Sequence, residues 1–160
     1  MRKILFRGKD YSGVMNHSWL FGSLDMSENG KPKIIFLDRY GNRCRARVEM
    51  ESVSQYTGLT DKNGKKIFEG DIVQYLTYDY FDCKSIVKFG KYEQDGSDGE
   101  YDPSECLGFY VEVDNFICPD WFDNDPTRFQ DHLKQQSLVE IASQCEIVGN
   151  IHDNPELLEV

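Results

Sequence analysis

Strict alternation of charged and smaller apolar residues over residues 43–51 is the clearest pattern in the chain. The odd positions carry Arg43, Arg45, Arg47, Glu49 and Glu51, and the even positions carry Cys44, Ala46, Val48 and Met50. Because successive side chains of a strand point to opposite faces, this pattern predicts a half-buried antiparallel strand with a charged outer face. The three arginines then form a row whose neighbours lie about 6.6–7 Å apart.

Short apolar runs bounded by turn signals predict further strands. These runs fall at residues 4–7, 19–24, 34–37, 72–76, 84–89, 107–113 and 146–151. The pair Asn63-Gly64 separates two short extended arms and predicts a type I′ hairpin, in which both central residues have positive φ. The pair Gly70-Asp71 predicts the turn that leads into the strand at 72–76.

Helical signals are few. Pro126 is suited to the first turn of a helix that carries Phe129 and Leu133 on one face. Residues 138–142 and 154–158 predict short helical turns. Many short strands with one or two short helices predict a mainly β or α+β protein built on a small barrel.

Composition narrows the class of protein. The chain has 160 residues, and its aromatic content of 13% is too high for a disordered protein. No run approaches the roughly 20 apolar residues of a membrane span, and the charged N-terminus lacks the apolar segment of a signal peptide. We therefore expect a cytoplasmic protein that does not contact a membrane. The five cysteines form no C-x-x-C motif, which favours reduced, buried thiols over zinc ligands.

The net charge of −10 is unevenly distributed. Residues 1–66 hold 13 basic and 7 acidic side chains, a balance of +6, whereas residues 67–160 hold 5 and 21, a balance of −16. Such asymmetry indicates either a site for a charged ligand or two portions that attract each other.

The first candidate site is basic. It consists of the N-terminal cations and the arginine row, namely Arg2, Lys3, Arg7, Lys9, Arg43, Arg45 and Arg47. Small barrels bind single-stranded nucleic acid through a basic groove with stacking aromatic rings, and Trp19, Phe21, Tyr40 and Tyr56 are the candidate rings. The alternative is that the row pairs with Glu49, Glu51 or the acidic half of the chain, and the overall acidity favours that alternative.

Two further candidates involve carboxylates. Asp98, Glu100 and Asp102 alternate in an acidic segment, as ligands of a hard cation can, but no EF-hand pattern is present. We expect solvated loops and neither metal nor cofactor. Asp71 is either a catalytic carboxylate or, as we expect, a residue that hydrogen-bonds the turn backbone beside a Gly70 of positive φ.

Three stretches together carry a family resemblance. They are Met1-Arg2-Lys3-Ile4-Leu5-Phe6-Arg7-Gly8-Lys9 followed by Trp19 to Leu24; Gln55-Tyr56-Thr57-Gly58-Leu59 and Asp61 through Val73; and Ile147 through Leu158. They resemble the YopX-like proteins of bacteriophages and prophages. This chain departs from the family pattern at residue 152, where it has His152 in place of the expected aromatic residue.

The resemblance implies an SH3-like barrel in the C-terminal part of the chain, and the turn at Gly70-Asp71 begins that barrel. It points to no particular activity and to no catalytic residues. We therefore divide the chain into an N-terminal β-rich subdomain, residues 1–56, and an SH3-like barrel subdomain, residues 57–160. Residues 91–105 and 119–131 are expected to be acidic insertions in the latter.

These observations favour a phage- or prophage-encoded accessory protein that acts as a non-enzymatic interaction module. Its partner is an unknown protein or a second copy of the chain, since docking of the +6 and −16 portions between copies gives a salt-sensitive oligomer. One alternative is a single-stranded nucleic-acid-binding protein that uses Arg2, Lys3, Arg7, Arg43, Arg45 and Arg47. The other is an undiscovered enzyme, for which the chain shows no recognised motif.

Overall fold

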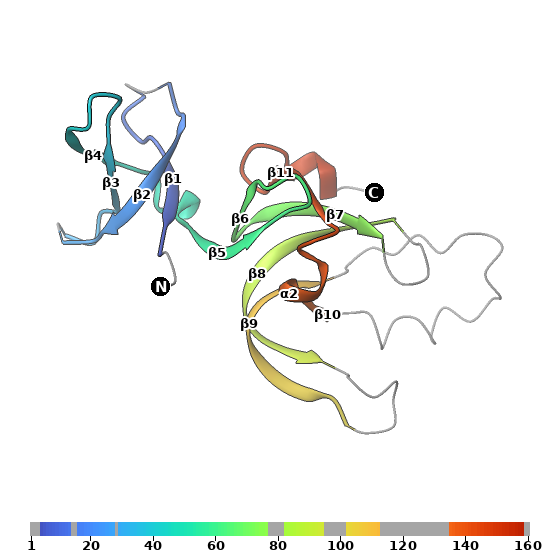
Figure 1. The fold of residues 1–160 in the computed structure, drawn as a ribbon. Coiled ribbons are helices and arrows are strands. Elements are labelled where there is room, and N and C mark those ends of the chain that lie inside the picture. The colour runs from blue at the N-terminus through green and yellow to red at the C-terminus, as the bar shows by residue number, and fades with distance from the viewer. Residues whose placement is uncertain are drawn as a thin grey trace. The chain divides into compact units, whose positions relative to one another are not determined.

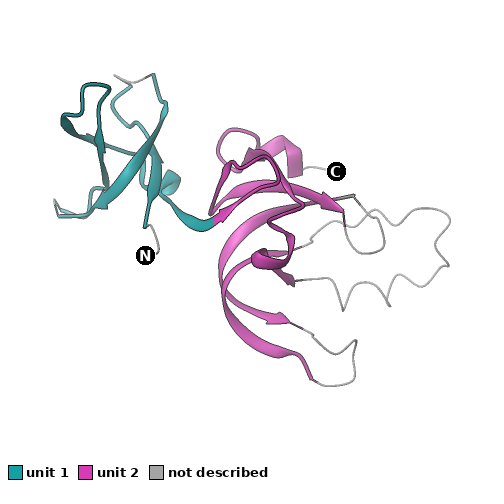
Figure 2. Ribbon diagram, viewed as in Figure 1, with its two compact units in different colours: residues 1–58 teal, residues 59–160 magenta. Residues whose placement is uncertain are grey.

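The chain forms two compact units, residues 1–58 and residues 59–160 (Figure 2). The structure is a computed structural model, and it describes residues 4–13, 16–27, 29–76, 82–94, 102–112 and 135–158. The sequence placed the boundary between residues 56 and 57, whereas the structure places it between 58 and 59. Each unit has its own core and is described by itself.

Unit 1 is a small antiparallel β-structure (Figure 1). Its elements are β1 (Phe6–Lys9), β2 (Trp19–Asp25), β3 (Lys33–Leu37), β4 (Arg43–Arg47), the 3₁₀ turn η1 (Met50–Ser52) and β5 (Ser54–Thr60). Neighbouring strands follow the order β4-β3-β2-β1-β5, and β5 continues past residue 58 to pair with β6. The strand predicted at 43–51 therefore ends earlier, and Met50 is exposed in η1 instead of buried.

The core of unit 1 is small and depends on close approach of the backbone. Leu20, Ile34 and Val48 are buried at its centre. A Cβ on Gly8 would lie 2.8 Å from the side chain of Val48, and a Cβ on Gly22 would overlap the backbone carbonyl of Ile35. Both glycines are thus required because another segment occupies the space that a side chain would take.

The chain after β4 returns to the end of β1. Asp10 and Val48 form an antiparallel bridge, the Glu49 N–H donates to the Lys9 carbonyl at 2.9 Å, and the Tyr11 N–H donates to the Arg47 carbonyl at 3.0 Å. β1 consequently pairs with β2 along its whole length and with β5 at Phe6 and Arg7, and the segment after β4 contacts its end.

Unit 2 contains a curved five-stranded sheet and short helical turns (Figure 1). Its elements are β6 (Lys66–Phe68), β7 (Asp71–Leu76), β8 (Asp82–Gln94), β9 (Ser104–Glu112), β10 (Gln135–Ser137), α2 (Leu138–Ile141), β11 (Glu146–Asn150) and the 3₁₀ turn η2 (Pro155–Leu158). The sheet order is β10-β9-β8-β7-β11, all antiparallel. Buried residues from β7, β8, β9, α2 and β11 form one core.

The mainly β fold class is confirmed, but the SH3-like barrel is not. Among the described strands, β10 and β11 are the two edges of an open sheet and do not pair with each other. The loop expected at 91–105 is partly wrong, because residues 91–94 belong to β8 and residues 104–105 belong to β9. The insertion at 119–131 and the helix expected from Pro126 lie outside the described residues. No helix in the described part of the chain is long and apolar enough to cross a membrane.

The hairpin at Asn63-Gly64 exists, but its turn type differs from the expected type I′. Gly64 has φ +79°, and Asn63 is not among the residues of positive φ. The Asp61 carboxylate accepts hydrogen bonds from the N–H groups of Asn63 and Lys65, both at 2.9 Å, and from that of Ile147 at 3.2 Å. The loop is therefore a three-residue connection with Gly64 in the left-handed position, held by a buried aspartate.

Replacing Gly22 with alanine should destabilise unit 1. The new Cβ has to displace the backbone of β3, and overpacking of this kind costs about 2–3 kcal/mol. Gly90→Ala is the matched control, because its Cβ would meet Tyr110 at an ordinary 3.7 Å. Urea unfolding followed by circular dichroism measures both, and equal midpoints for the two variants would contradict the packing argument.

Asp61→Ala should lower the free energy of unfolding of unit 2 by about 3 kcal/mol, because three N–H groups lose their acceptor. Asp61→Asn keeps one side-chain oxygen and should lose less. The same urea titration compares them, and an asparagine variant as unstable as the alanine variant argues against the hydrogen bonds as the cause.

Candidate functional site

Unit 1 presents an apolar inner face and a basic outer face. The register pairs Ile34 with Ala46 toward the core, and Ile35 with Arg45 on the opposite side. Along β1 to β4 the outer positions carry six cations and one acid, which are Arg7, Lys9, Lys33, Arg43, Arg45, Arg47 and Asp25. Alternation within each strand and pairing between strands together gather these residues on one side of the sheet, which we call the basic outer face.

Trp19 lies on this face beside two cations of β1. The register places Lys9 opposite Trp19 and Arg7 opposite Phe21. The guanidinium carbon of Arg7 lies 4.5 Å from the centre of the Trp19 ring, and Lys9 Nζ lies 5.8 Å from it. Arg7 is only 7% exposed, so the ring supplies part of the stabilisation that burial of a cation requires.

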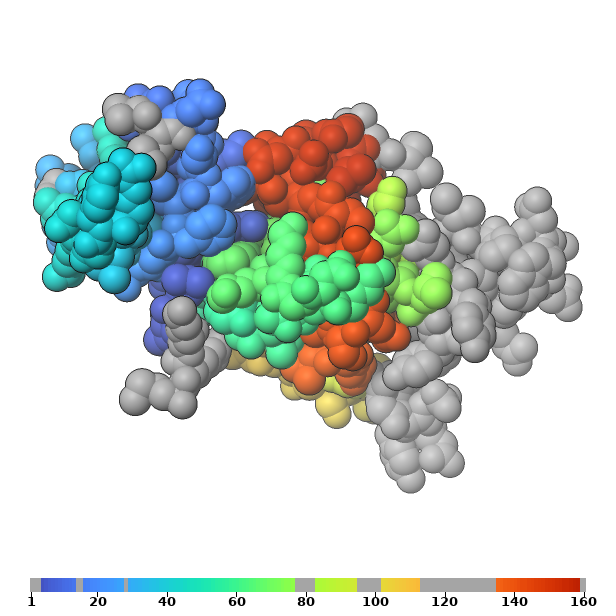
Figure 3. Space-filling model, turned by 45° about the horizontal axis from the view of Figure 1, so that its top comes forward, coloured from blue at the N-terminus to red at the C-terminus, as the bar shows by residue number. Residues whose placement is uncertain are grey.

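Two further arginines stack on tyrosines. The guanidinium carbon of Arg47 lies 4.0 Å from the Tyr11 ring centre, and that of Arg39 lies 4.7 Å from the Tyr40 ring centre. Both tyrosines are exposed. The turn between β3 and β4 that carries Arg39 and Tyr40 lies at the surface, where it is coloured cyan in Figure 3.

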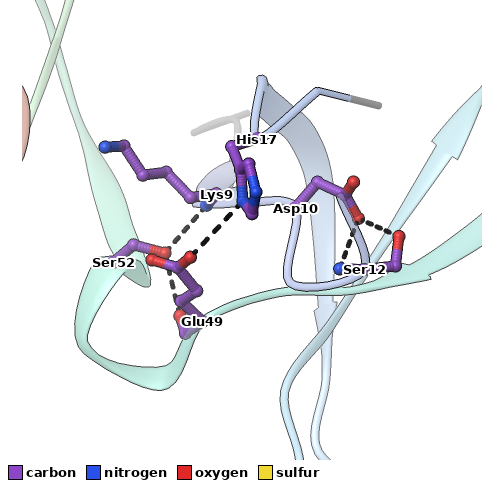
Figure 4. Close-up of polar contacts among 6 residues, drawn as sticks. All are labelled: Lys9, Asp10, Ser12, His17, Glu49 and Ser52. Carbon is purple, nitrogen blue, oxygen red and sulfur yellow. Dashed lines mark hydrogen bonds and ion pairs between the residues drawn. The ribbon is translucent and has the colours of Figure 1, made fainter. Parts of the chain in front are cut away.

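A group of hydrogen bonds fixes the end of β1 (Figure 4). The Lys9 N–H donates to Ser52 Oγ at 2.8 Å, and the Ser52 hydroxyl donates to the Glu49 carbonyl at the same distance. The buried Asp10 carboxylate accepts from the N–H of Ser12 at 3.2 Å and from its hydroxyl at 2.7 Å. These bonds hold the backbone on either side of Lys9, and so they position its side chain beside Trp19.

The arginine row is only partly neutralised. Arg45 Nη1 lies 3.4 Å from Asp25 Oδ2 in an exposed ion pair, and Arg43 and Arg47 have no carboxylate partner among the described residues. Hydrogen bonds from the Ser27 hydroxyl and N–H, followed by the weaker effect of Arg45, hold the pKa of Asp25 below its ordinary value. Pairing with Glu49 or Glu51, the alternative expected from the sequence, is not seen; Glu49 instead lies 3.9 Å from His17.

The structure gathers most of the predicted site and revises the rest. Arg7, Arg43, Arg45 and Arg47 share the basic outer face, whereas Arg2 and Lys3 lie outside the described residues. Phe21 and Tyr40 are exposed, but Tyr56 is 9% exposed and cannot offer a ring to a ligand. Sequence reasoning missed Lys33 and Tyr11, whose positions depend on pairing with β4.

Polar residues of the family-like stretches in unit 2 hold turns. Gly70 has φ +77°, and Asp71 accepts a hydrogen bond from the Phe68 N–H at 2.7 Å, which confirms the expected turn role. Asn150 Oδ1 accepts from the N–H groups of His152 and Asp153, both at 3.0 Å.

The described thiols and carboxylates show no cluster suited to a metal. Cys83 and Cys145 are buried, Cys44 and Cys106 are partly exposed, and burial raises the pKa of the Cys145 thiol to about 11. Within the described ranges, no group of three or more His, Cys, Asp or Glu residues could hold an ion. Asp98 and Glu100 lie outside those ranges.

Comparison with known proteins identifies a family for both units. The family model described as YopX protein matches residues 5–159. Among solved structures, the crystal structure of protein EF1440 from Enterococcus faecalis is 24% identical in sequence, with a TM-score of 0.46, over 99% of this chain and 100% of that chain. No curated protein matches the chain.

Proposed function

The chain belongs to the YopX family, and from that premise we propose that it is a non-enzymatic interaction module that binds single-stranded nucleic acid on the basic outer face of unit 1. The resemblance to phage and prophage proteins supports a phage- or prophage-encoded accessory role in the host cytoplasm. Membership of this family does not indicate a ligand, so the ligand is inferred from the chemistry of the surface.

The observation that supports this ligand is the local charge of the face. Its strands carry six cations and a single acid on one side, although the whole chain has a net charge of −10. Exposed charges are screened beyond about 8–10 Å at physiological salt, so a phosphate on this face responds to the nearby cations far more than to distant acidic residues. Exposed rings beside the cations provide the second feature of single-strand binding surfaces.

Several polar side chains that could suggest catalysis have structural roles instead. Asp61, Asp71 and Asn150 accept hydrogen bonds from turn backbone, and the Cys145 thiol is held neutral by burial. These assignments support a binding protein over an enzyme.

A second candidate partner is another copy of the chain. The opposite charges of residues 1–66 and 67–160 favour docking of the basic outer face on an acidic surface of a neighbouring molecule. Such an assembly should dissociate as salt is raised. Static light scattering at low salt tests it, and a monomer there excludes it.

Arg43→Ser/Arg45→Ser should weaken binding to a single-stranded oligonucleotide and reduce its dependence on salt. Each cation that contacts a phosphate contributes about 0.7 to the slope of log K against log salt concentration for single strands, so the slope should become shallower by about 1.4. Both side chains are exposed on β4, so the fold should be unaffected. Fluorescence anisotropy of a labelled oligonucleotide between low and physiological salt gives both slopes.

The matched control is Lys65→Ser/Lys66→Ser, which removes two exposed cations from unit 2. It changes the net charge of the chain equally but leaves the basic outer face intact. The proposal predicts an unchanged slope for this control. Equal losses in the two double variants would show that net charge, rather than this face, controls binding, and absence of binding by the wild-type chain at low salt would refute the function.

Asp25→Asn should strengthen binding by up to about fivefold at low salt, because it removes the one acid among the strand residues of the face. Because the pKa of Asp25 lies below the ordinary value of an aspartate, this carboxylate is charged throughout the range from pH 5 to pH 8. The gain in affinity should therefore be constant across that range. Asparagine keeps an oxygen for the Ser27 N–H at 2.9 Å. The same anisotropy titration measures the gain, and a weaker complex would oppose the proposed location.

A further inference from the structure

Two aromatic residues on β2 lie at alternate positions on the basic outer face. Trp19 and Phe21 are two residues apart, which separates them by about 6.6–7 Å along the strand. Phe21 is 50% exposed and Trp19 is partly exposed, whereas the intervening Leu20 is buried in the core. The rings therefore belong to the ligand-facing side of the sheet and are not needed to fill the small core beneath.

The cations beside these rings fit a nucleotide better than a peptide carboxylate. Arg7 and Lys9 both lie within 6 Å of the Trp19 ring centre. A nucleotide presents a flat base and a phosphate close together, so one small area of protein that offers a ring and the partly exposed Lys9 can bind both parts. An acidic peptide offers the charge but has no flat group for the ring.

The arginine row lies at a suitable separation from the ring pair. In the order β4-β3-β2, one strand separates the row from β2, and β3 pairs with Ser23–Asp25, the part of β2 that follows the ring pair. Between them, β3 presents Ile35 and the exposed Leu37 on the same face. This spacing lets bases reach β2 while part of the phosphate backbone follows β4.

We propose that Trp19 and Phe21 stack on consecutive unpaired bases of the single strand, and that the partly exposed Lys9 binds a phosphate beside them, while the buried Arg7 packs against the Trp19 ring and positions it. This inference rests on the proposed function, and it adds how the protein would bind single strands in preference to duplex. Bases in a duplex have both faces covered by their neighbours, so only an unstacked strand can place them on these rings. Trp19 is thus the residue that distinguishes single strands from duplex, whereas the arginine row contributes affinity for either.

The test uses the intrinsic fluorescence of Trp19. The chain has two tryptophans, so a Trp121→Phe background leaves Trp19 as the only one. Its emission is titrated with oligothymidylate, with an abasic oligonucleotide of equal length, and with a duplex of equal length. We expect strong quenching by oligothymidylate, and weaker binding with little quenching by the other two probes.

Trp19→Leu provides the second measurement. Anisotropy with labelled oligothymidylate should show a loss of affinity of about 5- to 150-fold, the range for loss of one base stack, with an unchanged salt slope. A purely electrostatic role would change the slope instead. Phe89→Leu, which alters an exposed ring of unit 2, should leave affinity and slope as in the wild-type chain.

The outcomes separate this inference from the function it rests on. Equal affinity for abasic and thymidine strands, unquenched emission and an unaffected Trp19→Leu variant would overturn the stacking while leaving nucleic-acid binding in place. Duplex binding as tight as single-strand binding would do the same. Poly-glutamate binding as tight as oligothymidylate would identify an acidic protein as the partner and overturn both, as would failure to bind any nucleic acid at low salt.

Discussion

Close backbone approach in unit 1 is the constraint on which the basic outer face depends. Among the described residues, the central cluster of this unit holds three buried apolar side chains, Leu20, Ile34 and Val48, with partly buried ones around them. A core of this size contributes little to the free energy of unfolding of the unit. Gly8 leaves space for the Val48 side chain, and Gly22 leaves space for the β3 backbone. The strands can therefore pack closely around the core. The buried apolar residues of these strands point inward, so alternation sends the charged residues outward, together with Phe21 and Leu37.

That outward placement concentrates like charge, and the aromatic rings relieve part of the cost. Arg7 and Arg47 lie against Trp19 and Tyr11, where the electron-rich ring faces offset some of the hydration that the guanidinium groups lose. One carboxylate, Asp25, neutralises part of the row from an exposed position. Binding of an anion to this surface would stabilise the folded unit, which links the packing of the unit to its proposed ligand.

The sequence predicted what depends on local periodicity and failed where pairing between distant segments decides. The arginine row followed from strict alternation, and the turn role of Asp71 followed from its neighbour Gly70. The type I′ turn was wrong because a buried aspartate, Asp61, holds Asn63 in a different conformation. Tyr11 and Lys33 were missed because only the bridge from β1 to the β4 segment and the β3–β4 register bring them beside the row. The open sheet of unit 2 likewise reflects long-range pairing that short apolar runs do not specify.

The two parts of the proposed site come from different parts of the sequence. Arg7, Lys9, Trp19 and Phe21 all lie in the N-terminal stretch that carries the family resemblance, whereas the row at residues 43–47 lies outside all three such stretches. In the proposed complex, ring stacking would select unpaired bases with little sensitivity to salt, and the row would supply a salt-dependent attraction that acts on any strand. The two contributions are therefore on separate strands, β2 and β4, with β3 between them. In the proposed complex, a change in the number of arginines on β4 would then alter affinity without altering the preference for single strands, which would depend on Trp19 and Lys9.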